Sequence, residues 1–390
     1  MRFAFAFLVF LFASCSDGNN SKNTKSNAET ESLTEAFYAP TPDLKVRFCE
    51  KTKEIEDVFY NLYYKRGFNG CVLVAKEGEV LYKKAWGYFN REKKIDLQEN
   101  SIFQLASVTK QFTAIAILRL MKEGKLSLEQ NVKEWIPDFP YEGINLKLLL
   151  CHRSGLPDYR YFCDVEYKEK STALSNENAI KLMNTCKPPL YYKPNKHFDY
   201  NNTNYMLLAN IIEKASGMSY KEYLNKIIFK PLRMEHTFVY DKLDTPKNVA
   251  IGYSAGCRRL YNDYQNGVVG DKNIYSNVED LYKWDQALYN GTVLDSATLA
   301  LAYQPYSPEM KTRNYGYGFR LKKLPNNDFI VFHGGWWKGY NTLFYRRLKD
   351  KTTIIILSNR ANFCFNDMTK VWNILDNENN KTVPSQQQDI

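Results

Sequence analysis

Ser107-Val108-Thr109-Lys110 opens the stretch SVTKQFTAIAILRLMK, residues 107–122, which decides the fold. Residues 111–122 are apolar nearly all round and stop before Gly124, which predicts a buried helix with a glycine end. Residues three apart on a helix share a face, so we expect Ser107 and Lys110 to be neighbours at its N-terminus. Backbone N–H groups there favour developing negative charge, and a partly buried lysine can accept a proton. The pair is a candidate nucleophile and base.

This spacing alone is weak support. A chain of 390 residues contains about one Ser-x-x-Lys by chance. The alternative interpretation is a capping serine beside a solvated lysine, so the other motifs decide between the two.

Strand patterns lie on both sides of this helix. We expect a hairpin from residues 71–75 and 80–88, and further strands at 315–321, 329–333, 342–347 and 352–357. The chain between them is helical in pattern; Ser276-Asn277-Val278-Glu279 reads as a capping box for a helix through Leu288. We therefore predict an α/β fold of the α+β type. Its antiparallel sheet is built from both termini and flanked by helices, and a mainly helical lobe is inserted, with the site in the cleft between.

The ends of the chain predict export. Met1-Arg2 is followed by an apolar run to Ala13 that is too short to span a bilayer and fits a signal peptide. Phe12-Ala13-Ser14-Cys15 resembles a bacterial lipobox, so residues 1–15 are expected to be a lipoprotein-type signal with Cys15 as the lipidation site. The alternative is an ordinary secretory signal with an incidental cysteine. We expect a disordered tether at 16–44, one domain at 45–375 and a disordered tail at 376–390.

Composition excludes several function classes. The chain has 44% hydrophobic residues, 25% charged residues and a net charge of +10, typical of a globular protein with a moderately basic surface. No arginine-rich run or zinc-finger spacing indicates nucleic-acid binding. Seven cysteines remain besides Cys15, an odd number that cannot all pair within one chain. Cys163 and Cys186 could form a bridge, but we expect mostly buried, reduced cysteines.

Tyr200-Asn201-Asn202 is the second candidate motif, ahead of a helical stretch at 205–214. Residues two apart point the same way in extended backbone, so Tyr200 and Asn202 are expected on one side. A phenol can move protons if an ammonium stabilises its anion, and the Asn202 amide can hold both Lys110 and a substrate amide. The alternative is a core tyrosine beside a capping asparagine.

His333-Gly334-Gly335 is expected to end the strand that begins at Phe329. Paired glycines allow another backbone to approach, so an extended substrate could pair with this edge, with His333 donating to a carboxylate or carbonyl. A simple bulge or turn is the alternative. The loop LLCHRSGLPD at 149–158 carries no mechanism by itself. The four histidines have no ligand spacing, so no metal site is expected.

Together these motifs resemble the serine β-lactamase superfamily, in its class C β-lactamase, DD-peptidase and esterase branch. Ser-x-x-Lys, Tyr-x-Asn and His-x-Gly stand in the family's order, and the 149–158 loop, IFKPLRM at 228–234 and Asp280-Leu281 extend the likeness over about residues 50–373. The resemblance implies that Ser107 forms an acyl-enzyme and that Lys110 and Tyr200 share the acid and base work. It also implies substrate binding by Asn202, His333, Gly334, Gly335 and Trp336, with the N–H groups of Ser107 and Trp336 as an oxyanion hole. No cofactor is needed.

Two departures from the family pattern affect the expected substrate. His333 replaces the lysine of Lys-Thr-Gly, which weakens the fixed positive charge for a carboxylate near neutral pH. Trp336-Trp337 follows the glycines, where smaller residues are usual, and two indoles narrow the pocket or form an aromatic wall. Both features argue against an efficient β-lactamase.

The leading hypothesis is an exported serine hydrolase of the cell envelope, attached to the membrane through lipid on Cys15 and without nucleic-acid partners. The alternatives are a β-lactamase, which needs fast attack of water on the acyl-enzyme, and a penicillin-binding or scaffold protein with little turnover. The complete set Ser107, Lys110, Tyr200 and Asn202 argues against a scaffold without chemistry.

Overall fold

The computed structural model describes residues 44–324 and 328–377, all of which belong to one unit, Ala39–Ile390. The predicted signal peptide, Cys15 and nearly all of the predicted tether and tail lie outside the described residues. None of the helices described is long and apolar enough to cross a membrane.

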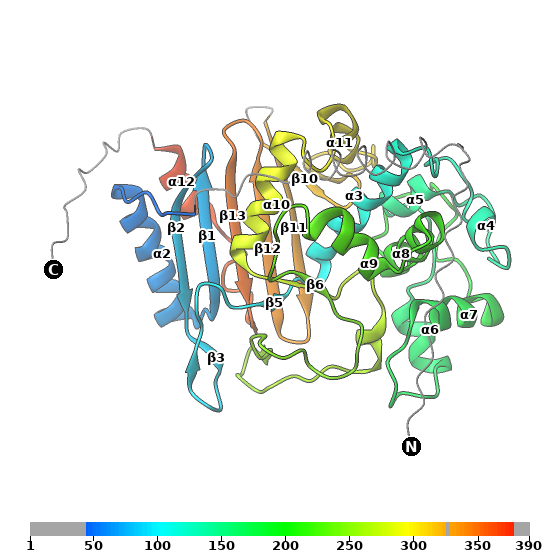
Figure 1. Ribbon diagram of the computed structural model, residues 1–390, viewed down its shortest axis with the longest axis horizontal. Coiled ribbons are helices and arrows are strands. Elements are labelled where there is room, and N and C mark those ends of the chain that lie inside the picture. Colours follow the sequence, from blue (N-terminus) through cyan, green and yellow to red (C-terminus); the bar gives the residue numbers. More distant parts are fainter. Residues whose placement is uncertain (1–43, 325–327, 378–390) are drawn as a thin grey trace, which may run out of the picture. The chain divides into compact units, whose positions relative to one another are not determined.

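A seven-stranded antiparallel sheet forms one side of this unit (Figure 1). Its strand order brings the two ends of the domain together, since the N-terminal hairpin pairs with the last long strand through β1 and β13. This confirms the predicted fold class. In sheet order the strands are β2 (Glu79–Trp86), β1 (Gly70–Lys76), β13 (Thr352–Ser358), β12 (Tyr340–Arg347), β11 (Phe329–Trp337), β10 (Arg320–Lys323) and β9 (Arg313–Tyr315).

The two faces of the sheet carry separate apolar cores because alternate side chains of a strand point to opposite faces. On β1, Val72 and Val74 pack against α2 (Glu50–Arg66) and α12 (Thr369–Asp376). Leu73 faces the other core, with α10 (Val278–Asn290).

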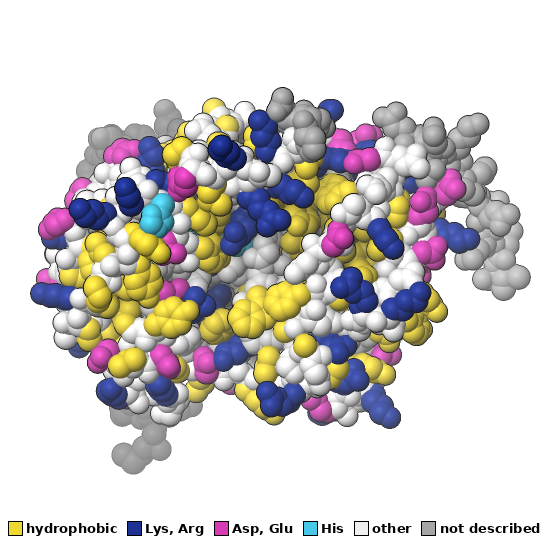
Figure 2. All heavy atoms as spheres, turned by 180° about the vertical axis from the view of Figure 1, so that it is seen from behind, with side chains coloured by type: hydrophobic (Ala, Val, Ile, Leu, Met, Phe, Trp, Pro, Cys, Tyr) yellow, Lys and Arg dark blue, Asp and Glu magenta, His cyan; other side chains and the backbone are white. Residues whose placement is uncertain are grey.

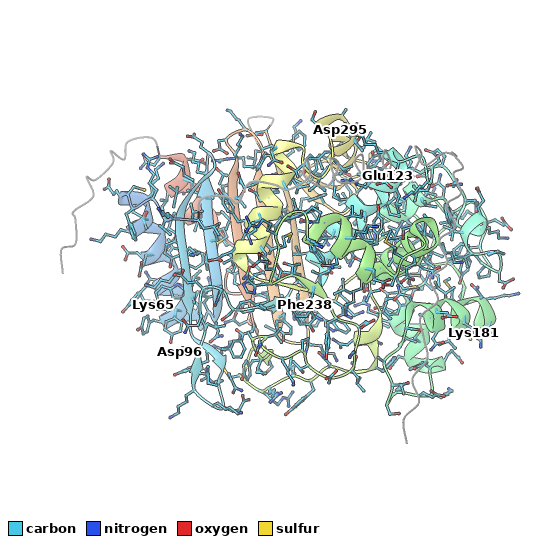
Figure 3. All side chains as sticks on the ribbon, viewed as in Figure 1. Lys65, Asp96, Glu123, Lys181, Phe238 and Asp295 are labelled. Carbon is cyan, nitrogen blue, oxygen red and sulfur yellow. The ribbon has the colours of Figure 1, made fainter. Side chains whose placement is uncertain are left out.

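The helical lobe surrounds α3 (Thr109–Lys122), which is buried along nearly its whole length, as predicted. Its C-terminal end lies beside the start of α11, where Lys122 pairs with Asp295 at 2.6 Å; Figure 3 labels Asp295 and the neighbouring Glu123. The other lobe helices are α4 (Val132–Trp135), α5 (Leu146–Leu150), α6 (Tyr159–Glu166), α7 (Asn176–Cys186), α8 (Asn202–Ser216), α9 (Tyr220–Leu224) and α11 (Ser296–Ala302).

Short elements complete the described part of the chain. Strand β5 (Phe103–Gln104) pairs with β8 (Ile274–Ser276), which also pairs with β6 (Phe238–Val239) and brings the chain before Ser107 against residues 274–276. The remaining elements are β3 (Tyr88–Asn90), β4 (Ile95–Asp96), β7 (Tyr253–Ser254), β14 (Arg360–Ala361), the 3₁₀ turns η1 (Ala106–Val108) and η3 (Tyr264–Gly267), and the π-turn η2 (Asn225–Phe229).

Three local predictions were wrong. Residues 315–321 form a hairpin between β9 and β10, because Gly318 adopts a φ of 76° where its Cα faces the carbonyl of Lys110. The strand that carries His333 does not end at the two glycines but continues to Trp337, paired with β12. The cap of α10 is Asn277, whose side chain accepts the N–H of Asp280 at 2.8 Å, and not the predicted Ser276 box.

The cysteines of the described residues are free thiols. Cys163 is buried and Cys186 is exposed, so the bridge that the sequence allowed is not formed. Burial raises the pKa of Cys163 to about 12, which leaves it an unreactive thiol at neutral pH.

Candidate active site

Ser107 lies in η1, the 3₁₀ turn that leads into α3. Ala106, directly before it, adopts a φ of 47°, a left-handed conformation that is uncommon for residues other than glycine. Such strain costs on the order of 1–3 kcal/mol and is maintained only where the surroundings enforce it. The backbone is held by pairing of Leu105 N–H with the carbonyl of Ile274 at 2.8 Å. The turn therefore presents Ser107 at the surface of a pocket.

Lys110 is completely buried one turn further along, and its contacts are specific. Its Nζ lies 3.2 Å from Oγ of Ser107, 2.8 Å from Oδ1 of Asn202 and 2.8 Å from the carbonyl of Asp271. The last two partners can only accept hydrogen bonds here. Nζ donates to both of them and to the Ser107 hydroxyl, so the amine is fixed beside Oγ of Ser107. The structure thus brings Ser107, Lys110 and Asn202 together.

Tyr200 and Asn202 flank the start of α8, where Asn201 is the cap. They do not share an extended strand, as the sequence suggested, because Asn202 is already helical; both nevertheless line the same pocket. The Tyr200 ring lies 5.0 Å from Lys110 Nζ and 4.7 Å from the guanidinium of Arg320. Its hydroxyl has no hydrogen-bond partner among the described residues and so can serve a substrate.

The 149–158 loop holds this second motif in place. The N–H groups on either side of Tyr200 both bind His152: that of Asp199 at the carbonyl (2.8 Å) and that of Asn201 at Nδ1 (3.2 Å). Asp158 Oδ2 accepts the N–H of Asn202 at 3.4 Å. The loop, to which the sequence assigned no mechanism, is therefore the support of Tyr200 and Asn202.

His152 is fully buried, with its ring 4.5 Å from that of Tyr200. Because Nδ1 accepts the Asn201 N–H, the ring proton is on Nε2. Burial, reinforced by the charges of Lys110 and Arg320, lowers its pKa well below the ordinary value, so the imidazole is neutral.

Strand β11 lies against the nucleophile. A Cβ added to Gly335 would stand 2.4 Å from the Leu105 carbonyl and 2.9 Å from the Ser107 nitrogen, so only glycine lets the strand approach this closely. Strand β10 pairs with β11 only as far as Arg320↔Phe332, whereas β12 pairs with it to Trp337↔Tyr340. Residues 333–337 therefore have a strand on one side only, and Gly334, Trp336 and Trp337 among them line the pocket.

His333 is placed differently from the other predicted residues. It is fully buried and does not line the pocket, although Gly334 and Trp336 do. Its Nδ1 donates to the Gly334 carbonyl at 2.7 Å, and its Nε2 accepts from the Tyr315 hydroxyl at 2.9 Å. Burial and the nearby charges of Arg320 and Lys110 lower its pKa well below the usual range. It is neutral and occupied by protein partners.

The pocket beside Ser107 has a volume of about 210 Å³. Sequence reasoning missed four charged residues of its wall: Arg160, Asp271, Lys272 and Arg320. The charged pair Asp271-Lys272 interrupts an otherwise apolar stretch, a signal that could have marked it. Arg320 had no local signal, since it reaches the pocket only because β10 ends there. The full lining is Ala106, Ser107, Arg160, Tyr200, Asn202, Asp271, Lys272, Arg320, Gly334, Trp336 and Trp337.

No group of three or more His, Cys, Asp or Glu side chains within residues 44–324 and 328–377 is arranged to hold a metal ion.

Comparison with known proteins places these residues in a family context. The Beta-lactamase family matches residues 55–376 of the chain. The chain is 37% identical over 326 residues to penicillin-binding protein 4* of Bacillus subtilis, covering 80% of this chain and 72% of that protein. The octameric penicillin-binding protein homologue of Pyrococcus abyssi has a similar structure, with a TM-score of 0.70 at 27% identity, over 80% of this chain and 74% of that one. EstCE1, a hydrolase with promiscuous acyltransferase activity, shares the fold at a TM-score of 0.69 and 19% identity, over 83% and 98% of the two chains.

Proposed function

Because the chain belongs to the Beta-lactamase family of serine hydrolases, we propose that it cleaves an ester or a peptidoglycan-type amide through an acyl-enzyme on Ser107. The observation that carries this proposal is the environment of Lys110. Its Nζ is 3.2 Å from the Ser107 hydroxyl, while two acceptors at 2.8 Å hold its other hydrogens. This arrangement is that of an activated nucleophile and its base.

The reaction begins when Oγ of Ser107 bonds to the substrate carbonyl carbon and its proton passes to Lys110. The negative charge on the carbonyl oxygen is received by the N–H groups of Ser107 and Trp336, each donor contributing about 3 kcal/mol in comparable sites. The bond to the leaving group then breaks, and the leaving oxygen or nitrogen takes a proton relayed from Lys110 through Tyr200. Water attacks the resulting ester by the same route, releasing the acid and restoring Ser107.

The open edge of β11 supports an extended substrate. Residues 333–337 have no strand on the side away from β12, so a substrate chain can add there as a strand and present its carbonyl to Ser107. Arg320 stands where β10 leaves this edge and makes no ion pair with any described residue. We assign to Arg320 the binding of a substrate carboxylate, the role that neutral His333 cannot fill.

Intact mass after exposure to benzylpenicillin tests the proposal, with wild type beside Ser107→Ala and a chromogenic ester assay on both. We expect a covalent adduct on wild type only, and a loss of ester turnover in Ser107→Ala of about 10⁴-fold or more. Penicillin consumed without an adduct would identify a β-lactamase instead. Turnover retained in Ser107→Ala, or no turnover of any ester, β-lactam or D-Ala-D-Ala peptide, would contradict the proposal.

We also propose that the chain is exported and anchored to the cell-envelope membrane through lipid on Cys15. The apolar run before Cys15 and the lipobox pattern support this. Metabolic labelling with an alkyne fatty acid in a bacterial host should mark the full chain but not Cys15→Ala, which should appear in the soluble fraction. Equal labelling of both proteins would exclude this anchor.

A further inference from the structure

The open edge of β11 has a cationic group at each end. Arg320 lies level with Phe332, where β10 stops, and Lys272 Nζ lies 5.1 Å from the ring of Trp337. Along the backbone of β11, five residues or about 16 Å separate Phe332 from Trp337. Ser107 lies between them, because its backbone nitrogen packs against Gly335. A substrate that follows the edge therefore passes one positive group, then the nucleophile, then a second positive group.

Lys272 is an unusual lysine because it is only 3% exposed and yet lines the pocket. It donates a hydrogen bond to the hydroxyl of Tyr159, and its only carboxylate contact among the residues that the structure describes is Asp271 Oδ2 at 3.5 Å. Burial lowers its pKa more strongly than the Asp271 charge raises it. An ammonium has three donors, so one remains for a ligand. An anion at this position would offset part of the cost of burying the charge.

Arg160 adds a second donor at the same end of the cleft. Its Nε and Nη2 bind Asp158 at 3.0 and 2.9 Å, which fixes the guanidinium, while its Nη1 has no hydrogen-bond partner in the described part of the chain. The pocket wall as a whole carries three cationic residues, Arg160, Lys272 and Arg320, against the single carboxylate of Asp271. On the face seen in Figure 2, Lys and Arg side chains gather in and around a hollow.

We propose that Lys272 and Arg160 form a second anion subsite, so that the preferred substrate carries a carboxylate on each side of the scissile bond. This rests on the proposed function above. Arg320 takes the carboxylate of the leaving group, and Lys272 with Arg160 takes a carboxylate of the acyl group. The two-residue distance from Gly335 to Trp337, about 7 Å, sets the length of the acyl chain between the carbonyl and its carboxylate.

Two thioesters of thioglycolate test this subsite, one with an adipoyl and one with an adipamoyl acyl group. They differ only in a terminal carboxylate or carboxamide of the same shape, and release of the thiol measures both. We expect wild type to prefer the adipoyl thioester by about tenfold or more in kcat/KM, less so at high salt. Lys272→Met should abolish the preference while the adipamoyl thioester is still hydrolysed, and Arg160→Gln should reduce it.

Lys338→Met is the matched control. Lys338 also lies over the Trp337 ring, at 5.3 Å, but it pairs with Asp263 and does not line the pocket. This variant should keep the full preference. Equal rates for the two thioesters in wild type, or an unchanged preference in Lys272→Met, would overturn the second subsite while leaving the hydrolase intact. Absence of Ser107-dependent turnover of both thioesters would instead overturn the proposed function.

Discussion

Nζ of Lys110 donates a hydrogen bond to Oδ1 of Asn202 at 2.8 Å, although the two residues are 92 positions apart. The contact joins the start of α3 to the start of α8. It occupies a hydrogen of the amine without supplying a negative charge. An amide, unlike a carboxylate, therefore holds Lys110 in place without adding a negative charge beside it.

Two substitutions of Asn202 separate these effects. Asn202→Leu leaves Lys110 without this acceptor, and we expect the free energy of unfolding to fall by about 1–3 kcal/mol. Asn202→Asp keeps the geometry but favours the ammonium, so it should stay folded and lose ester turnover by about 10- to 100-fold near neutral pH. Urea unfolding and kcat/KM measure the two quantities. An Asn202→Asp enzyme as active as wild type would show that Lys110 is not the base.

Gly335→Ala tests the contact between β11 and the nucleophile. The added methyl would meet the Leu105 carbonyl and the Ser107 nitrogen at under 3 Å, so the turn must shift. Displacement of a reacting group by about 1 Å can cost about 100-fold in rate, and we expect a kcat loss of that order. Gly334→Ala is the comparison, since its nearest neighbour, the Thr342 carbonyl, is 3.5 Å away. Equal losses in both variants would show that the close approach has no catalytic role.

His152→Ala should lower kcat through Tyr200. The substitution removes the Nδ1 acceptor of the Asn201 N–H and the ring packed on Tyr200, at a cost of about 1–3 kcal/mol for the orphaned donor. His152→Asn should restore much of the activity, since its Oδ1 can accept the same N–H and asparagine tolerates the φ of 57° found here. A fall in kcat without a change in KM for His152→Ala, together with recovery of kcat in His152→Asn, would identify His152 as a positioning residue. Ala and Asn variants with equal rates would exclude it.

The buried histidines predict a loss of stability in acid. The pKa values of His152 and His333 are both lowered by burial, so the unfolded chain binds protons first as pH falls. Their contribution to stability is complete above about pH 6.5 and declines below it, by up to about 1.4 kcal/mol per pH unit for each histidine. The charged or titratable groups that act on His152 are Lys110, Arg320 and His333.

Urea midpoints of wild type and His152→Asn at pH 7.5 and 5.0 test this dependence. The wild type should lose more stability between the two values than the variant, because only the wild type has this imidazole to protonate. Parallel losses in the two proteins would mean that His152 is protonated in the native state as readily as in the unfolded chain.

Arg320→Met should act on substrates that carry a carboxylate in the leaving group. For a thioglycolate thioester we expect kcat/KM to fall by about 10- to 100-fold, the effect of losing a charged hydrogen bond. The loss should be smaller for the methyl ester of the same leaving group. If Arg320→Met slows both substrates equally, Arg320 acts by holding Tyr200, whose ring it contacts at 4.7 Å, and does not bind the substrate carboxylate.

Sequence reasoning located the candidate site residues better than it described their surroundings. Ser107, Lys110, Tyr200 and Asn202 were predicted from short motifs, and the structure brings all four to one place. The sequence-based prediction of strands was weaker at glycines, which can either form a turn or lie within a strand. Gly316 and Gly318 form a hairpin, whereas Gly334 and Gly335 continue a strand. Whether a glycine turns the chain or admits a neighbour depends on what packs against it.

The sequence by itself determined the buried helix, the strands at both ends and the order of the motifs, because apolar periodicity and side-chain chemistry are local properties. Only the tertiary structure decided which charges face Ser107. Arg320, Lys272 and Arg160 come from three separate segments of the chain, and His333 is buried away from the pocket, where it bonds to Tyr315. Burial and charge depend on neighbours that are far away in the chain, and these set the protonation of the site and the substrate it can hold.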